Sequence, residues 1–350
     1  MRLGQSNNGN PLKNLWRIIP GVLVSLVAIV ALFNFVSFGS AWAVIRTVKI
    51  WQIIFVALFT VFFLAVRAIG WKALLGEKAT YKETFLKLSE GYFVNNIFPL
   101  RMGEISRAIF MGVTMQVNPA QILSSIVVER VFDLMIMATF LVILIPVVLD
   151  LQAYQSMALI ILAVMIFGLI TLYFIARNQE KVKKILGNLG QRVPMLNRFL
   201  LPIFYSLLDG FQTLRSPIQF VIGFFGVLGS WLVSMVQYSA FLIFMVKDAG
   251  WWWGVAANTA LAMGIALPSA PAGLGLFEGS LVAALKIFGI DESIGLAYAL
   301  VLHVVQFIVT GAIGLYALYR DGNSVKGLFS RLTQQKQFEK NPINPGVGHE

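Results

Sequence analysis

The sequence predicts an all-α polytopic membrane protein, a bundle of about six transmembrane helices with two re-entrant hairpins of broken helices. Its 350 residues are 58% hydrophobic and only 12% charged, whereas soluble domains carry about 25% charged residues. Six apolar runs approach or reach the length that crosses a bilayer, about 17–25 residues. Two further apolar segments are each interrupted by polar residues, prolines and glycines.

The composition also limits the chemistry. The chain has no cysteine and only two histidines, His303 and His349. Disulfides, cysteine-ligated clusters and multi-histidine metal sites are therefore excluded, and we expect neither a metal nor a cofactor. The formal net charge of +11 lies mostly between the apolar runs. This distribution favours contact with anionic lipid headgroups over nucleic acid, for which the sequence has no recognition motif.

The first half is expected to contain three spans, at about residues 18–38, 50–66 and 122–149. Residues 1–17 are polar and basic and are predicted to be a cytoplasmic segment. Ala41-Trp42-Ala43 has the form of a signal-peptide cleavage site, but the preceding run is longer than the usual ~7–15 apolar residues. The basic stretch over residues 67–90 is expected to stay in the cytoplasm under the positive-inside rule.

The second half repeats this arrangement, with spans expected at about residues 158–175, 218–246 and 294–319. The basic stretch 177–215 is predicted to be cytoplasmic and to include an interfacial helix at 197–214. Trp251-Trp252-Trp253 indicates an external interface, and residues 321–350 read as a disordered cytoplasmic tail. Both termini are thus expected in the cytoplasm, in a multi-pass protein of the inner or plasma membrane.

The two halves predict an inverted repeat within one transmembrane domain, residues 18–320. Each half reads span, span, hairpin, span, and an odd number of crossings inserts the second repeat (about 155–320) upside down relative to the first (about 18–150). Transporters built this way bind substrate near the membrane midplane, where the repeats meet. Glu104 and Glu129 are 25 residues apart, as are Glu278 and His303, so His303 would be the repeat partner of Glu129.

The first break lies between Asn95 and Glu104 and contains Pro99 and Gly103. Helices over residues 82–95 and 103–115 with a turn at Phe98-Pro99 would form a re-entrant hairpin. Backbone at bilayer depth leaves the helix only where protein or a wet cavity satisfies it. The alternative is an amphipathic pair of helices on the cytoplasmic surface.

Three arginines near this break, Arg101, Arg107 and Arg130, are candidate ligands for a phosphate group. Guanidinium binds planar oxyanions through paired hydrogen bonds, and a charge at bilayer depth costs at least ~2.5–3.5 kcal/mol, so its presence requires a reason. Glu104 would share a helical face with Arg101 and Arg107 if the helix begins early enough. In the alternative interpretation Glu104 only caps the helix, and the arginines face water or headgroups.

Glu129 and Asp133 lie four residues apart, on one helical face, and repel each other unless cations intervene. Arg130 reaches Asp133 but points about 100° away from Glu129. A second cation is therefore expected, supplied by Arg101 or Arg107. The network either fastens the hairpin to the third span, binds substrate, or does both.

The second break contains Pro268, Pro271, Gly273 and Gly275, and has no cation. The helix that resumes after it offers backbone N–H groups and a partial positive charge to an anion. Glu278 is either a helix cap or a protonatable coupling group. His303, in the middle of a span, is either hydrogen-bonded to a neighbouring helix or part of a proton relay.

Three motifs in this order resemble the flippase-like family that includes the membrane part of lysylphosphatidylglycerol synthases. They are Asn95-Asn96-x-x-Pro99-x-Arg101-x-Gly103-Glu104-x-x-Arg107, Glu129-Arg130-x-x-Asp133, and Pro268-x-x-Pro271-x-Gly273-x-Gly275-x-Phe277-Glu278. The resemblance implies a protein that moves or presents a lipid with an anionic headgroup between leaflets. The synthases carry a soluble catalytic domain after the membrane part, whereas about thirty residues follow the last span here. Lysine transfer by this chain alone is therefore not expected.

The function predicted is that of a flippase for an anionic lipid, a transporter rather than an enzyme. Arg101, Arg107, Arg130, Asn95 and Asn96 are expected to bind the headgroup, with Glu104, Glu129, Asp133, Glu278 and His303 supporting them or coupling transport to protons. Partners would be the lipid and either a second copy of the chain or a lipid-modifying enzyme. The alternatives are a membrane-embedded transferase or accessory subunit acting on a lipid-linked sugar or aminoacyl donor, and a scaffold that binds anionic lipid.

Overall fold

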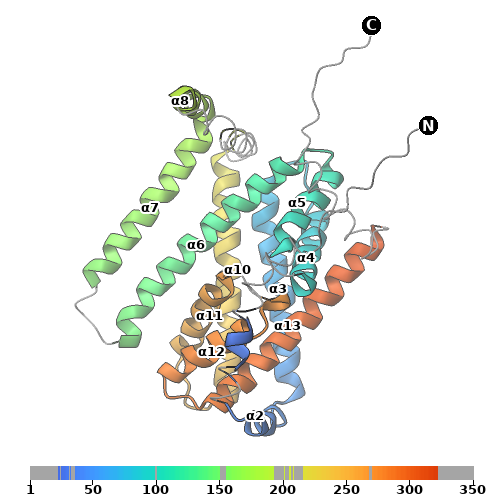
Figure 1. Cartoon of the computed structure of the whole chain (residues 1–350), viewed down its shortest axis with the longest axis vertical. Helices are drawn as coiled ribbons and strands as arrows, with labels where there is room; N and C mark the ends of the chain where they lie inside the picture. The colour runs from blue at the N-terminus through green and yellow to red at the C-terminus, as the bar shows by residue number, and fades with distance from the viewer. Residues whose placement is uncertain are drawn as a thin grey trace.

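The computed structural model describes residues 36–98, 101–149, 155–192, 216–267 and 270–321, with a few residues between 23 and 32 and between 201 and 208. All regular structure in these ranges is helical, which confirms the all-α class (Figure 1). Some predictions lie outside the described residues: Pro99 and Pro268, most of the first span, most of the interfacial helix at 197–214, and the tail after Asp321.

The observed helices follow the predicted order. They are α2 (Phe38–Ile45), α3 (Ile50–Leu75), α4 (Tyr81–Ile97), α5 (Met102–Met115), α6 (Pro119–Leu149), α7 (Gln155–Arg177), α8 (Gln179–Arg192), α10 (Pro217–Met245), α11 (Trp251–Ala266), the short 3₁₀ turn η4 (Pro271–Gly273), α12 (Leu276–Ile287) and α13 (Glu292–Arg320). Among the described residues, α3, α10 and α13 are long and apolar enough to cross a membrane.

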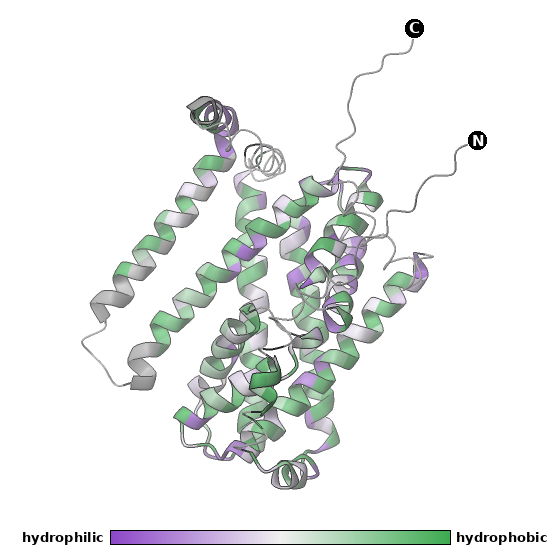
Figure 2. Cartoon of the chain, in the orientation of Figure 1, coloured by the Kyte–Doolittle hydropathy of each residue, from purple (hydrophilic) through white to green (hydrophobic). Residues whose placement is uncertain are grey.

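Hydrophobic residues make up most of these helices, whereas α8 contains many hydrophilic residues (Figure 2). The helix α6 has 31 residues and α7 has 23. Two differences from the sequence prediction concern helix limits. The short helix α2, capped by the Ser37 side chain, was not predicted. The second broken segment, predicted to begin at Ala256, begins at Trp251, so the three tryptophans expected at an interface form the first turn of α11.

A larger difference concerns the stretch 67–90, predicted to be a cytoplasmic basic segment. The helix α3 continues past residue 66 to Leu75 and ends where Gly76 adopts φ 88°. Arg67 therefore lies inside α3, with 3% of its surface exposed. Lys87 lies buried in α4, where it forms ion pairs with Glu90 and Asp321. The second span is therefore longer than predicted, and both cations are neutralised by carboxylates inside the fold.

The helices α3 and α10 pack backbone against backbone at the centre of the bundle. A Cβ atom on Gly70 of α3 would lie 2.9 Å from the nitrogen of Val227 and 3.0 Å from the carbonyl carbon of Gly226, both in α10. A side chain could avoid such a contact by changing its rotamer, but these two backbone atoms cannot. The absence of a side chain at Gly70 therefore sets the distance between these two helices.

We expect Gly70→Ala to destabilise the protein by about 1–3 kcal/mol, the usual cost of overpacking a filled core. The measurement is the midpoint of thermal unfolding in detergent. Gly311→Ala in α13 is the matched control, since a Cβ there meets no atom within 4 Å and alanine favours the helix. A midpoint that is equal in the two variants would contradict this account of the α3–α10 contact.

The two broken segments lie on either side of the middle of the bundle. The hairpin α4–α5 occupies the upper half of Figure 1 and the segment α11–η4–α12 the lower half, and α13 passes both. The helix α4 also contacts η4 directly. The first hairpin has close to its predicted limits, 81–97 and 102–115 against 82–95 and 103–115. The ends of the two segments are thereby brought together.

Candidate functional site

A cavity of about 560 Å³ lies where the two breaks meet. Side chains from both broken segments and from α3, α6, α10 and α13 line it. Its charged lining consists of four arginines and two carboxylates, namely Arg67, Arg101, Arg107, Arg130, Glu104 and Asp133. The second break contributes Ala270, Ala272 and Gly273, and α13 contributes His303. The cavity is therefore polar and cationic on the side of the first break.

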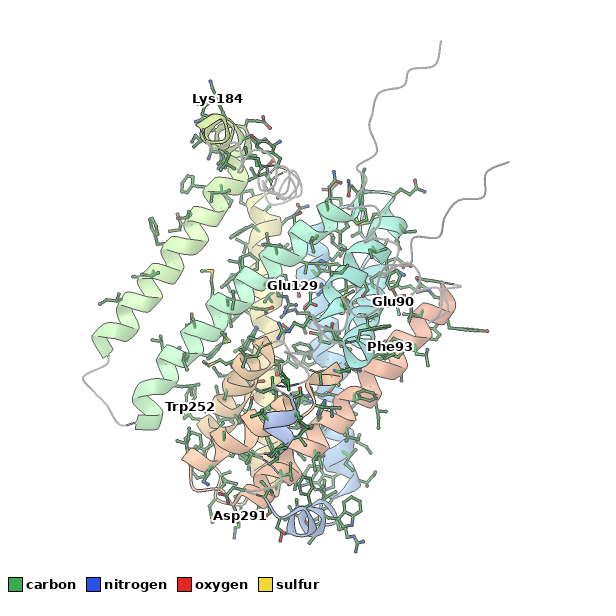
Figure 3. All side chains as sticks on the ribbon, viewed as in Figure 1. Glu90, Phe93, Glu129, Lys184, Trp252 and Asp291 are labelled. Carbon is green, nitrogen blue, oxygen red and sulfur yellow. The ribbon has the colours of Figure 1, made fainter. Side chains whose placement is uncertain are left out.

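The centre of the charged cluster is Arg67, which sequence reasoning missed. Its Nε lies 2.9 Å from Oε1 of Glu129, and its Nη1 lies 2.7 Å from Oδ1 of Asp133. Glu129 is fully buried at the centre of the bundle, where Figure 3 labels it. One guanidinium thus bridges the two carboxylates whose mutual repulsion predicted a second cation. The available signal was a lone arginine within an apolar run that continues to Leu75.

Arg107 supplies a further cation to the same carboxylate. Its Nη2 lies 2.7 Å from Oε2 of Glu129, and its guanidinium carbon lies 3.9 Å from the centre of the Trp71 ring. Arg107 is almost completely buried. This contact agrees with the expectation that an arginine of the first hairpin would neutralise the acidic face of α6. It fastens α5 to α6.

Arg101 does not join this cluster. Its guanidinium donates a hydrogen bond to the backbone carbonyl of Ile265, near the end of α11. Helix α5 begins only at Met102, and Arg101 adopts φ 52°, so Arg101 does not share a helical face with Glu104 and Arg107. That part of the prediction was wrong, because the helix begins one residue too late. Arg101 instead links the first break to the second.

Arg130 is the most accessible arginine of the acidic cluster on α6, with 37% of its side chain exposed. Its Nη atoms lie 3.1 Å from Oε1 of Glu129 and 3.1 Å from Oδ2 of Asp133. The expectation that it points away from Glu129 was wrong, because the long side chain folds back along the helix. Nε of Arg130 and Oε2 of Glu104 are buried without a hydrogen-bond partner among the described residues. Both residues line the cavity.

The two asparagines of the first break line the cavity and also bind protein groups. Oδ1 of Asn95 accepts a hydrogen bond from the backbone N–H of Gly103 at 2.7 Å, at the start of α5. Nδ2 of Asn96 donates to Oγ1 of Thr310 at 3.0 Å, in α13. Both side chains therefore hold the hairpin in place.

The second break is held by Glu278 and His303. Nδ1 of His303 lies 2.6 Å from Oε1 of Glu278, and the ring stacks on Phe277 with centroids 4.2 Å apart. Oε2 of Glu278 accepts a hydrogen bond from the backbone N–H of Gly275 at 2.9 Å. Gly275 adopts φ 83°, a conformation that requires glycine. Glu278 is therefore a helix cap and a histidine partner at once.

Further residues completing the site were not singled out from the sequence. Trp231 of α10 donates from Nε1 to Oδ1 of Asp133 at 2.9 Å. Gln306 of α13 donates to the hydroxyl of Tyr238 at 3.1 Å. These side chains lie in long apolar helices, where periodicity does not distinguish a residue facing the cavity from one facing another helix.

Comparison of the sequence with known proteins places the chain in a family. The family model described as "Lysylphosphatidylglycerol synthase TM region" matches residues 18–314. A "UPF0104 membrane protein" of Methanothermobacter thermautotrophicus is 27% identical over 280 residues, which is 75% of this chain and 82% of the relative. Another, from Methanocaldococcus jannaschii, is 24% identical over 241 residues, 65% of this chain and 95% of the relative.

No solved structure gives a significant match to the chain. The family match agrees with the resemblance drawn from the three motifs, and it includes both breaks and the arginine cluster. Together with the apolar helices it makes the chain a multi-pass membrane protein. This protein belongs to the family of the lysylphosphatidylglycerol synthase transmembrane region.

Proposed function

We propose that this protein is a flippase that moves an anionic, phosphate-bearing lipid or lipid-linked precursor between leaflets, with the headgroup in the cavity between the two breaks. One observation carries the proposal: four guanidinium groups line a single cavity. Three carboxylates accompany them, Glu104, Asp133 and the buried Glu129. The cavity lining together with Glu129 thus has four positive and three negative groups, and charges inside a membrane protein mark substrate or ion pathways.

Arg101 and Arg130 are the arginines best placed to bind the headgroup. Arg130 has 37% of its side chain exposed, and Arg101 is bound to a neutral carbonyl that an anion can replace. Arg67 and Arg107 are buried against Glu129 and keep the acidic face of α6 neutral. Arg107 thus belongs to the support of the site and strengthens its positive potential.

The architecture supporting this function has six spans, two re-entrant hairpins and an inverted repeat. Each hairpin is followed by a helix that binds it through a buried side chain: Glu129 of α6 binds Arg107, and His303 of α13 binds Glu278. The equal spacing of 25 residues from Glu104 to Glu129 and from Glu278 to His303 fits such a repeat. Broken helices that meet around a polar site are a common transporter plan.

The proposed topology places both termini and α8 in the cytoplasm. Because the chain has no cysteine, a single cysteine reports the side of the membrane without a background signal. Lys183→Cys in α8 is expected to react with a membrane-impermeant maleimide only after the cells are opened. Asp248→Cys, at the opposite end of α10, is expected to react in intact cells. The reverse pattern would contradict the topology.

The function is tested with purified protein in liposomes that contain a fluorescent phosphatidylglycerol. The measurement is the fraction of label that a membrane-impermeant reductant reaches, with mass spectrometry of the lipids afterwards. We expect exchange between leaflets with no covalent change in the lipid. A modified lipid product would instead support the transferase alternative. The absence of both exchange and product would reject the flippase and favour a lipid-binding scaffold.

A further inference from the structure

The pair Glu278 and His303 attaches both sides of the second break to α13. Besides the contact with Glu278, Nε2 of His303 lies 3.1 Å from the carbonyl oxygen of Ala272, in η4. The other carboxylate oxygen of Glu278, Oε2, accepts a hydrogen bond from the backbone N–H of Gly275, just before α12. The pair is buried, but His303 lines the cavity. It therefore connects the backbone of the break with the space proposed for the headgroup.

The two contacts of His303 set the number of protons that the pair needs. A neutral imidazole carries one N–H group, and an ionised carboxylate carries none. Both hydrogen bonds of His303, to Oε1 of Glu278 and to the Ala272 carbonyl, need a hydrogen each. For both contacts to be hydrogen bonds, the pair must hold one proton beyond neutral histidine and ionised glutamate. The count is the same for imidazolium beside carboxylate and for imidazole beside carboxylic acid.

From this geometry we infer that Glu278 and His303 form a proton-binding site that controls the second break, and that the proton is the ion coupled to lipid movement. The proton-binding site is argued from the hydrogen bonds alone, whereas the coupling to lipid movement rests on the proposed function.

Loss of the proton has two consequences. A lone pair of the imidazole ring would then face either the carboxylate or the Ala272 carbonyl, so one of the two attachments breaks. Ala272 adopts φ 57° and ψ 1°, a left-handed conformation that its β carbon disfavours. Without the hydrogen bond from His303, nothing described holds its carbonyl there. The break is then free to change conformation.

The second consequence is electrostatic. The protonated pair has no net charge, whereas the deprotonated pair carries one negative charge at the wall of the cavity. A negative charge there opposes the binding of an anion. Proton and anion therefore favour each other's binding, and by linkage the effect is reciprocal.

Other titratable groups surround the pair without contacting it. Within the described residues none of them forms a hydrogen bond with Glu278 or His303. Those lining the same cavity are Arg67 of α3, Tyr92 of α4, Arg101, Glu104 and Arg107 of α5, Arg130 and Asp133 of α6, and Tyr238 of α10. Those near the ends of α13 are paired elsewhere, as Lys286 with Glu292 and as Lys87, Glu90, Glu83, Arg320 and Asp321 among themselves. The hydrogen bonds of the pair are therefore independent of these other charged groups.

The proton site is tested by nuclear magnetic resonance of the full chain in liposomes. The variant His349→Ala leaves His303 as the sole histidine, so ¹⁵N-labelled histidine reports one residue. We expect both ring nitrogens to be hydrogen-bonded, one to the Glu278 carboxyl group and one to the Ala272 carbonyl, and to respond together when the pH of the sample is varied. A neutral imidazole with a bare ring nitrogen, beside ionised glutamate signals in the ¹³C spectrum at every pH measured, would overturn the proton site.

The coupling is tested by exchange under a pH gradient of about one unit, which accelerates the wild type by up to about tenfold. In Glu278→Gln the amide N–H₂ donates to His303 and its oxygen accepts from Gly275, so the bonds remain without a removable proton. This variant is expected to ignore the gradient, which is measured as the ratio of its exchange rates with and without the gradient, whatever its rate at equal pH. The control Glu292→Gln, in the surface pair with Lys286, keeps the response.

An equal response of Glu278→Gln and wild type would overturn the coupling, as would a wild type that exchanges lipid but ignores the gradient. A wild type without any exchange would reject the flippase function instead. The resonance titration then decides the proton site independently.

Discussion

Replacing Arg67 with methionine is expected to cost about 3–5 kcal/mol, the usual effect of removing one partner from a buried ion pair. Arg67 contacts both Glu129 and Asp133, and the methionine side chain would leave these carboxylates short of one positive charge. Proteins are stable by about 5–15 kcal/mol in total. The variant is therefore expected to lose a large share of its stability and to unfold at a clearly lower temperature than the wild type. Size-exclusion profiles after a heating series measure this loss.

Two controls separate charge balance from side-chain volume. Arg177→Met removes an exposed arginine at the end of α7 and is expected to change nothing. The double variant Arg67→Met with Asp133→Asn removes one cation and one anion, so it is expected to recover part of the lost stability. A double variant that is less stable than Arg67→Met alone would contradict the charge account.

Arg130→Ala is expected to lower lipid exchange by about 10–100-fold while the protein still folds. A hydrogen bond to a charged group contributes about 1.5–3 kcal/mol, and each 1.4 kcal/mol is a factor of about ten. The fold tolerates the change because Glu129 and Asp133 keep Arg67, and Asp133 keeps the Trp231 N–H. The measurements are the exchange rate in liposomes and the unfolding midpoint of the same preparation.

The matched control is again α7, where Arg177→Ala removes the same group far from the cavity. Arg130→Lys is expected to fall between wild type and alanine, because lysine keeps the charge but loses the paired hydrogen bonds. Arg101→Ala is expected to slow exchange as well. Unchanged exchange in both alanine variants would remove the phosphate site from this cavity.

Much of the fold could be predicted because membrane helices are read from apolar length, and breaks from proline and glycine. The limits of α4 and α5 differ from the predicted ones by at most two residues. The need for a second cation near Glu129 and Asp133 also followed from spacing alone. The source of that cation could not be predicted, because Arg67 lies 62 residues before Glu129 and resembles the start of a basic loop.

The contacts that the two breaks make with distant parts of the chain were equally difficult to predict. The partner of Arg101 is a backbone carbonyl, which every residue carries, so no residue type marks Ile265. The contact of His303 with Glu278 was foreshadowed only by their equal spacing to another pair, and its second contact, with the Ala272 carbonyl, has no sequence signature. Local sequence patterns predict helices and their ends. Which polar groups come into contact depends on how helices distant in the sequence pack together.

Under the proposed function, the hydrogen bond between Arg101 and the Ile265 carbonyl would compete with the lipid for this guanidinium. A headgroup would bind Arg101 only by displacing a neutral oxygen of the opposite hairpin. A phosphate oxygen carries charge and wins that exchange, whereas an uncharged polar headgroup has no such advantage. The protein would thus select charged headgroups over uncharged ones, because the headgroup must compete with a backbone carbonyl for Arg101. Binding of a headgroup would also break the contact between the two hairpins, so headgroup binding and separation of the hairpins would form one equilibrium.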